Sequence, residues 1–322
     1  MISTFFFSPG GDKMMRGTDF WSDFIVHIPL PTAFEDPQEK AAMLADVRYL
    51  LLVGSLMRPR RLAKLASEAF GLKAVGTYFN IVDHFELCDR EYCVEVVDLG
   101  LPGGETMAIV SHGIGSSGAE IVIKEMRALI HWSNAFLGRD EASVRVRCVG
   151  RSGTRGTLGD VAYGSVGIST ASYNDNLEIA LPDAELNQQV LACAKALGVP
   201  YALGSGVSTE FFWLGQGRHT PPEGRIPAHI DAERTRRAQD KLWRFVEHGI
   251  LFAEMEDYTV HSVCAELGIA SASVGAVIAR RFDVERGEFI IDYDRSAKTR
   301  SELLPAQLII AAFIEHAKAF SR

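Results

Sequence analysis

The stretch Thr106-Met-Ala-Ile-Val-Ser-His-Gly-Ile-Gly-Ser-Ser-Gly118 joins an apolar run to a turn that contains three glycines. The apolar run is typical of a buried strand, because it is short and ends at turn-forming residues. Residues 118–131 follow it with apolar side chains at helical spacing, which form one stripe along a helix. The stretch therefore predicts a strand, a tight turn and a helix in succession.

The same succession continues in both directions along the chain. Strand patterns lie at 49–53, 74–79, 92–98, 106–111, 143–149, 161–168, 199–206, 250–253 and 272–279. Helix patterns begin at residue 39 and recur at 60–70, 118–131, 183–197, 231–247 and 256–267. Strands that alternate with helices predict an α/β sheet with helices on both faces. No composition shift marks a boundary, so we expect a single domain over residues 1–322. Its first 38 residues are expected to form an irregular, aromatic N-terminal arm.

The composition is that of a globular chain with a sizeable core, since 47% of the 322 residues are hydrophobic and 23% are charged. The formal net charge of −8 makes nucleic acid and anionic membrane surfaces improbable partners. The five cysteines are scattered and form no C-x-x-C pair, which argues against a disulfide framework or a zinc site. The densest apolar run, 308–314, is too short for a membrane span. We therefore expect a cytoplasmic protein.

The three glycines, Gly113, Gly115 and Gly118, match the pattern G-x-G-x-x-G and allow three interpretations. The first is the fingerprint of an NAD(P)-dependent oxidoreductase, which also requires an acidic residue at the end of the next strand. Here Asp140 and Glu141 precede that strand, which weakens this interpretation. The second is a tight turn that lets strand and helix pack closely. The third is a loop whose backbone N–H groups bind a small anion.

Two further loops place arginines beside glycines and hydroxyl groups. One contains Arg147 and the segment Gly150-Arg-Ser-Gly153, and the other contains the turn Gly54-Ser55 followed by Arg58, Arg60 and Arg61. Arginine offers a fork of donors that suits phosphate, and serine adds another donor. Three such loops in an acidic chain favour a focused site for a phosphate-like group.

Four motifs occur together in one order along the chain. They are Ser111-His-Gly-Ile-Gly115 after a strand, Gly150-Arg-Ser-Gly153, Phe212-Trp-Leu-Gly-Gln216-Gly-Arg218, and Glu254-Met-Glu256 before a helix. On these motifs the chain resembles the uridine phosphorylases of the nucleoside phosphorylase family, in particular the longer eukaryotic type. The resemblance implies a central mixed β-sheet flanked by helices. It also implies reversible phosphorolysis of uridine to uracil and ribose 1-phosphate, with inorganic phosphate as co-substrate and with no cofactor and no metal.

For the base, the resemblance implies that Gln216 and Arg218 recognise uracil and stabilise its departure, that Phe212 stacks on the ring, and that Ile278 borders the pocket. The residue chemistry agrees, since Gln216 offers both donors and an acceptor to the edge of uracil and Arg218 offers donors. Purine-specific relatives place an aspartate after the late strand, and the segment 277–281 has none.

For the ribose, the resemblance implies that Glu256 binds the 2′-hydroxyl and supports the positive charge that develops at C1′. Met255 would lie against the sugar, and His27 would reach the 5′-hydroxyl from the partner subunit of a homodimer. The implied phosphate-binding set is Gly54, Arg61, Arg147, Arg151 and Ser152, together with Arg90 from the partner subunit. A monovalent cation beside Glu91 at the dimer interface is a further expectation.

The chain departs from the family pattern at several points. Arg151 stands where the family has threonine, and Arg147 is one residue further from Gly150 than usual, so either a bulge restores Arg147 or Arg151 replaces it. Extra residues after Gly54 leave Arg58 or Arg60 as alternatives to Arg61. The stretch 219–230 resembles an insertion that would block hexamer assembly. A purine-type phosphorylase, a hydrolytic nucleosidase, an oxidoreductase that uses the 113–118 loop and an inactive nucleoside-binding protein remain open.

Overall fold

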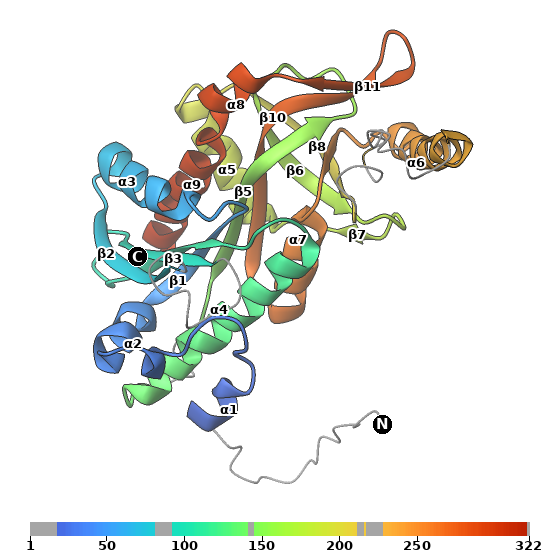
Figure 1. The fold of residues 1–322 in the computed structure, drawn as a ribbon. Helices are drawn as coiled ribbons and strands as arrows, with labels where there is room; N and C mark the ends of the chain where they lie inside the picture. The colour runs from blue at the N-terminus through green and yellow to red at the C-terminus, as the bar shows by residue number, and fades with distance from the viewer. Residues whose placement is uncertain (1–17, 81–91, 141–144, 211–215, 217–227, 321–322) are drawn as a thin grey trace, which may run out of the picture.

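A mixed sheet runs through the middle of the protein in the computed structural model, which describes residues 18–80, 92–140, 145–210, 216 and 228–320 (Figure 1). Its strands are β1 (Val47–Val53), β2 (Lys73–Asn80), β3 (Cys93–Asp98), β4 (Thr106–Ser111), β5 (Cys148–Thr157), β6 (Val166–Tyr173), β7 (Ile179–Ala180), β8 (Tyr201–Ser208), β9 (Phe252–Glu254), β10 (Ala270–Asp283) and β11 (Glu288–Tyr293). The helical elements are α1 (Thr18–Ser22), η1 (Pro31–Ala33), α2 (Pro37–Ala45), α3 (Arg58–Phe70), α4 (Ser116–Phe136), α5 (Ala184–Ala196), α6 (Ala228–Glu247), α7 (Asp257–Leu267), α8 (Arg295–Ser301) and α9 (Leu304–Phe320). The predicted α/β class is confirmed.

The strands β4, β1, β5 and β10 lie side by side and are parallel. Beyond them the sheet curls, because β5 also pairs with β9, β9 with β8, β8 with β6, and β6 with β10. These pairings return to β5 through β10, so the described strands close into a ring at one end of the sheet. The carboxyl ends of the parallel strands β1, β4 and β5 therefore meet at one edge, where loops can share a site.

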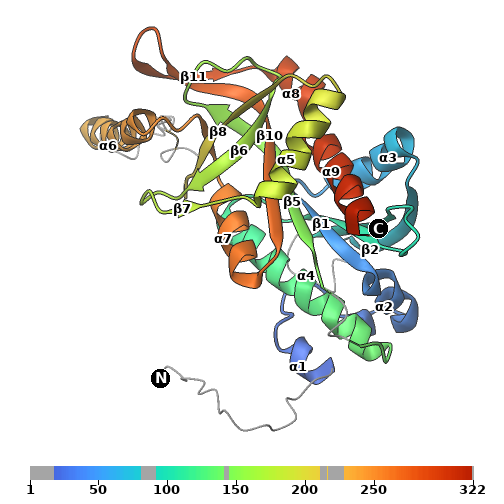
Figure 2. The ribbon, with the colours of Figure 1, turned by 180° about the vertical axis from the view of Figure 1, so that it is seen from behind.

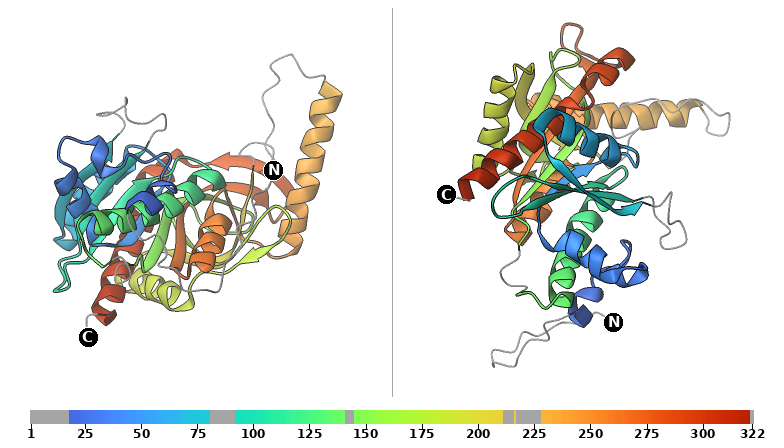
Figure 3. Two further views of the ribbon diagram at one scale, coloured as in Figure 1. Left: turned by 90° about the horizontal axis from the view of Figure 1, so that it is seen from below. Right: turned by 90° about the vertical axis from the view of Figure 1, so that its left-hand side faces the viewer.

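Two apolar cores cover the two faces of the sheet. Alternate residues of β1 divide between them, with Leu50 and Leu52 in one core and Tyr49 and Leu51 in the other, as the period of a strand requires. The first core includes side chains of α2, α4 and α7, and the second includes side chains of α3, α5 and α9. Figure 2 shows the second face. In Figure 3, α6 extends away from the body of the sheet.

The prediction of a strand over residues 143–149 followed by a loop is wrong in its bounds, because residues 145–147 precede the strand and no loop follows at 150–153; residues 143 and 144 lie outside the described residues. Strand β5 begins at Cys148 and continues to Thr157, through the glycines that suggested a turn. These glycines are required by close packing rather than by a bend. A Cβ atom at Gly150 would lie 2.3 Å from Ile309 Cγ2, and one at Gly153 would lie 2.7 Å from Arg151 Nη2.

The C-terminal elements β11, α8 and α9 were not predicted as helices or strands. The apolar run 308–314 lies in α9, whose side chains pack against β5 and β10 and are mostly buried. Among the described residues, the segment Arg295–Phe320 is long and apolar enough to cross a membrane, but half of its most apolar window is buried inside the protein. Its apolar character is accounted for by its role as a core helix. Within the predicted arm, the described part holds α1 and η1.

Candidate active site

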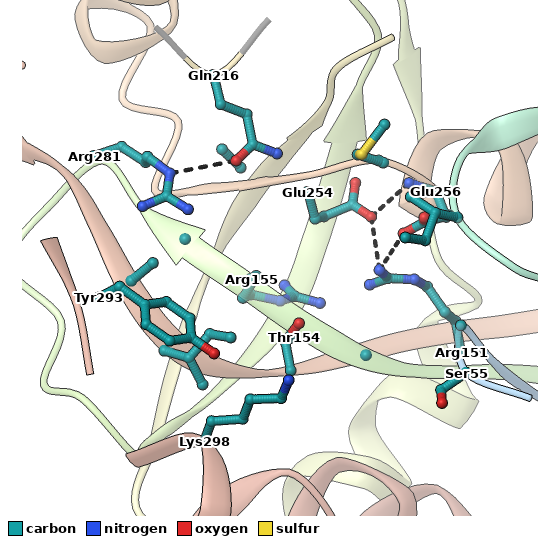
Figure 4. Close-up of a pocket in the computed structure, with 18 of the residues that line it drawn as sticks. Ser55, Arg151, Thr154, Arg155, Gln216, Glu254, Glu256, Arg281, Tyr293 and Lys298 are labelled. Atoms are coloured by element: carbon teal, nitrogen blue, oxygen red, sulfur yellow. Dashed lines mark hydrogen bonds and ion pairs between the residues drawn. The ribbon is translucent and has the colours of Figure 1, made fainter. Parts of the chain in front are cut away.

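A pocket with a volume of about 340 Å³ opens at the carboxyl ends of β1, β4, β5 and β9 (Figure 4). The turns β1–α3, β4–α4 and β9–α7 contribute to its walls, and β5, β10, β11, α8 and Gln216 complete them. The charged residues that line it are Arg58, Arg151, Arg155, Glu254, Glu256, Arg281 and Lys298. Five of these seven are cations, which suits an anionic ligand in a protein whose net charge is −8.

Arg151 is the centre of a buried network of charges. Its Nη1 atom donates to Asp257 Oδ1 at 2.7 Å, and its Nη2 atom donates to Glu256 and lies 3.2 Å from Glu254 Oε2. Burial alone favours the neutral form, but the three carboxylates outweigh it and hold the pKa of Arg151 well above its usual range. Arg151 in turn keeps the pKa of Glu256 below its ordinary value in spite of burial. Arg151 is thus a charged residue whose charge the protein itself compensates.

Glu256 also fixes the glycine turn. Its Oε1 atom accepts the N–H of Gly115 at 2.7 Å, and next to it Ser116 Oγ donates to the carbonyl of Met255 at 3.0 Å. Gly113 and Gly115 have φ values of 77° and 97°, which favour glycine. At Gly118 a Cβ atom would lie 2.2 Å from the carbonyl oxygen of His112. These contacts explain the three glycines as a tight turn bound by a carboxylate, without a dinucleotide.

The two carboxylates on either side of Glu256 hold the β9–α7 turn in place. Glu254 caps α7, because its Oε2 atom accepts the N–H groups of Glu256 and Asp257 at 2.6 and 2.9 Å. Asp257 is fully buried and accepts from Arg155 Nη2 at 3.2 Å and from Ser169 Oγ at 2.6 Å. The segment 254–257 is therefore bonded to β5 and β6, and this rigidity fixes the direction of Met255 and Glu256 in the pocket.

Gln216 and Arg281 form a pair at the other end of the pocket. Arg281 Nε donates to Gln216 Oε1 at 3.3 Å, and each residue is 5% exposed. Arg281 reaches the pocket because the register of β10 shifts between Val277 and Ala279 against β5 and again between Arg280 and Phe282 against β11. Ile278, which the resemblance implied as a border of the base site, is also one of the residues that line the pocket. The sequence did not identify Arg281 as a residue of the site. In the sequence, the segment 277–281 is notable only because it lacks the aspartate of purine-specific relatives.

Only some of the residues predicted to bind phosphate line the pocket in the structure. Gly54 lines the pocket with Ser55 and Arg58, whereas Arg61 points to α8 and pairs with Glu302 at 2.7 Å. Arg60 lies 3.3 Å from Glu95. Of the three arginines after Gly54, the structure brings Arg58 to the pocket and not Arg61.

Arg147 precedes β5 and lies at the amino end of the strand, where its Nη1 atom is 2.6 Å from Glu105. The pairing of β1 with β5 runs without a register shift from Tyr49 opposite Cys148 to Val53 opposite Ser152, so no bulge brings Arg147 to the pocket. Of the two arginines that the sequence left as alternatives, the structure places Arg151 in the pocket. Ser152, also predicted to bind phosphate, is fully buried and does not line the pocket, and its hydroxyl has no hydrogen-bond partner in the described part of the chain.

His27 lies against its own subunit. Its Nδ1 atom is 2.6 Å from Glu125 Oε1, and the backbone N–H groups of His27 and Ile28 donate to Glu125 Oε2 at 2.8 and 2.9 Å. These bonds attach the arm to α4, and His27 does not line the pocket of its own chain. Met255 and Glu256 do line it.

Other predicted residues cannot be placed. The predictions for Arg90, Phe212 and Arg218, the cation beside Glu91, and residues 219–227 of the expected insertion lie outside the described residues. Sequence reasoning also missed three pocket residues besides Arg281, namely Arg155, Tyr293 and Lys298. Within the described ranges, no group of three or more His, Cys, Asp or Glu residues could hold a metal ion.

Comparison with known proteins gives one consistent result. Residues 59–313 match the model of the phosphorylase superfamily. The uridine phosphorylase of Escherichia coli K12 is 25% identical over 192 residues, which make up 56% of this chain and 67% of that protein. The uridine phosphorylase of Thermococcus kodakarensis is 27% identical over 245 residues, or 75% of this chain and 76% of that protein. That of Haemophilus influenzae is 26% identical over 197 residues.

Proposed function

Because this chain belongs to the phosphorylase superfamily, we propose that it catalyses the reversible phosphorolysis of uridine to uracil and ribose 1-phosphate. One observation supports the proposed substrates, which membership of the family alone does not specify. The pocket has an amide–guanidinium pair, Gln216 and Arg281, at one end and Arg58 with the Gly54 turn elsewhere on its wall. The first pair suits the polar edge of a pyrimidine, and the second group suits an anion.

At the base, the amide of Gln216 and the guanidinium of Arg281 would hydrogen-bond the carbonyl and imide groups of uracil. When the bond between C1′ and N1 breaks, its electron pair goes to the base, and uracil leaves as an anion that then takes up a proton. Donors that face the carbonyl oxygens stabilise this charge as it forms. Arg218 and Phe212 are proposed to join this set from the resemblance, with Ile278 bordering the ring.

At the ribose, we propose that Glu256 accepts the 2′-hydroxyl and that Met255 packs against the sugar. Each oxygen of Glu256 already accepts one hydrogen bond in the structure, from Gly115 or from Arg151. A carboxylate oxygen has a second lone pair, so a ribose hydroxyl can still donate to it. The negative charge of Glu256 would also stabilise the positive charge at C1′ in the transition state.

At the phosphate, an oxygen forms the new bond to C1′ from the face opposite the base. Gly54 and Arg58, which line the pocket, are the proposed contacts, and Arg151 would orient the site through its bond to Glu256. No covalent nucleophile is needed, because holding phosphate and ribose in line and stabilising the separating charges lowers the barrier.

For the assembly, we propose a cytoplasmic homodimer that acts in pyrimidine salvage. Arg90 and His27 of the partner subunit would then complete each phosphate and ribose site, and a cation would lie beside Glu91. This part of the proposal rests on the family resemblance. Size-exclusion chromatography with light scattering tests it, since a fully active monomer would contradict shared sites.

The experiment that tests the reaction is the absorbance change of uridine with the purified protein, with and without orthophosphate. Uracil release that requires phosphate is the expected result. Release without phosphate would identify a hydrolytic nucleosidase, and cleavage of inosine in preference to uridine would identify a purine-type enzyme. If neither nucleoside is cleaved, NAD(P)H binding distinguishes an oxidoreductase from an inactive nucleoside-binding protein. An Arg218→Ala enzyme with full activity would contradict the role proposed for Arg218.

A further inference from the structure

Two cations of the pocket, Arg58 on α3 and Lys298 on α8, form no ion pair with a carboxylate in the described ranges. Neither side chain donates a hydrogen bond there, and Glu302, the acid whose charge acts on Arg58, is itself paired with Arg61. Arg151, by contrast, is bonded to Asp257 and Glu256 and lies close to Glu254. The charge available to an incoming anion is therefore on the side of α3 and α8.

An ion pair brings these two cations to one side of the pocket. Arg61 lies three residues after Arg58, Glu302 lies four residues after Lys298, and the two side chains pair at 2.7 Å. Residues three or four apart share a face of a helix, and the N–H of Glu302 donates to the carbonyl of Lys298 at 2.9 Å, which continues the helical turn between them. The pair thus directs Arg58 and Lys298 toward each other's helix. Because Arg61 neutralises Glu302, that acid leaves Lys298 available to a ligand.

Strand β5 contributes Thr154, a residue with a hydroxyl group, to the wall of the pocket. Side chains alternate along a strand, so Gly150, Ser152 and Thr154 share one face, and a Cβ atom at Gly150 would meet Ile309 of α9. Thr154 and Lys298 both line the pocket, and Figure 4 labels both among its lining residues. Ser152 lies on the same face but is fully buried and does not line the pocket, so Thr154 is the hydroxyl-bearing residue of this face that reaches it.

We infer that Lys298 is a phosphate-binding residue, which adds to Arg58 a second pocket cation that forms no ion pair within the described ranges. The inference rests on the proposed function for its substrate, inorganic phosphate, or the phosphate group of the sugar phosphate in the reverse direction. A phosphate dianion requires two opposing charges for close compensation, and a lysine serves as a point charge while an arginine orients two oxygens. Neither Arg147 nor Arg61 fills this place, since each is paired elsewhere.

The test compares Lys298→Met with the wild type in two measurements. The first is the KM for orthophosphate at saturating uridine, which should rise about ten- to hundredfold, the cost of losing a hydrogen bond to a charged group. The KM for uridine should change less than about twofold. The second is the rise in melting temperature that orthophosphate alone produces, which needs no catalysis and should be largely lost. Lys298→Arg should restore both, and Lys64→Met on α3, whose side chain is 75% exposed, is the matched control.

The outcomes separate the inference from the proposed function. Normal phosphate KM and normal stabilisation by phosphate in Lys298→Met would overturn the inference and leave phosphorolysis untouched. A wild type that is stabilised by phosphate through Lys298 but does not cleave uridine would uphold the inference and reject uridine as the substrate. A wild type that phosphate does not stabilise would overturn the inference. If Lys298→Met is unstable, Lys298→Gln gives the same comparison.

Discussion

Arg151 in β5 and Glu256 at the start of α7 are 105 positions apart in the chain and form a buried ion pair, with side chains 5% and 7% exposed. Glu256 bonds in addition to Gly115, and Arg151 bonds to Asp257. One pair thus joins a strand, a helix start and the glycine turn. The effects of this ion pair on the free energy of unfolding and on the reaction can be measured separately.

The stability of this network depends on Arg151. Arg151→Met leaves three carboxylates buried beside one another, and breaking such a cluster should lower the free energy of unfolding by about 3–5 kcal/mol. Adding Glu256→Gln removes one of the uncompensated charges. The loss in free energy of unfolding of the double variant should therefore be clearly smaller than the sum of the losses of the two single variants. Urea unfolding of the four proteins measures this coupling. The pair Arg139 and Asp46, whose side chains are 45% and 44% exposed, is the control, with an expected coupling within about 1 kcal/mol. Additive effects at Arg151 and Glu256 would contradict the prediction.

The proposed contact of Glu256 with ribose predicts a difference between two substrates. Glu256→Gln should lower kcat/KM for uridine by about 10²–10³, because a charged acceptor near C1′ is lost. The loss should be smaller for 2′-deoxyuridine, which has no 2′-hydroxyl to donate. Steady-state kinetics with both nucleosides measures the two ratios. Equal losses would mean that Glu256 acts through the glycine turn and not on the sugar.

The proposed role of Arg281 at the base has a control in the adjacent residue. Arg281→Met should reduce kcat/KM for uridine about 10²-fold, since a donor aimed at the leaving base is removed. The KM for phosphate should stay nearly constant.

Arg280→Met removes the same charge from the next position of β10, where the side chain is 32% exposed and lies 3.4 Å from Asp160. It should leave uridine kinetics almost unchanged. If both variants lose activity equally, the effect comes from the net charge of β10 and not from contact with the base.

Two buried histidines predict that the protein loses stability in mild acid. Burial lowers the pKa of His112 and of His261 from 6.5 to about 4. In the unfolded chain both rings take up a proton as the pH falls through 6.5, while in the folded protein they stay neutral down to about pH 4. The stabilising contribution is therefore complete above pH 6.5 and is lost as the pH falls toward 4, by about 2 kcal/mol per histidine between pH 7 and pH 5.

Urea unfolding at pH 7, 6 and 5 measures this slope. His261→Gln should reduce this slope by the equivalent of about one proton taken up on unfolding, because Gln does not titrate. Gln can still hydrogen-bond Ser271, which lies 2.9 Å from the histidine ring. The control His248→Gln replaces an exposed histidine at the end of α6. A slope that His261→Gln leaves unchanged would contradict the prediction.

Much of the site could be predicted from sequence because its residues form short local motifs. The turn at 113–118 requires glycine at positions with positive φ or close packing, and Glu254, Met255 and Glu256 stand next to one another before a helix. Gln216 was also identified from its motif, and it lines the pocket. Local backbone geometry and residue type suffice for such features, so the sequence by itself determined the α/β class, the glycine turn and the β9–α7 segment.

The tertiary structure alone decided which cations face the pocket. Arg147 and Arg151 are four residues apart, and their positions depend on β5 beginning at Cys148 and continuing to Thr157, which is set by its pairing with β1 and β10. The choice of Arg58 over Arg61 depends on Glu302, and Arg281 enters through register shifts in β10. Lys298 joins from α8 and lies 141 residues after Thr157, the last residue of β5. The direction of a long side chain follows from strand register and from ion pairs between distant elements, and neither is encoded in the residues beside it.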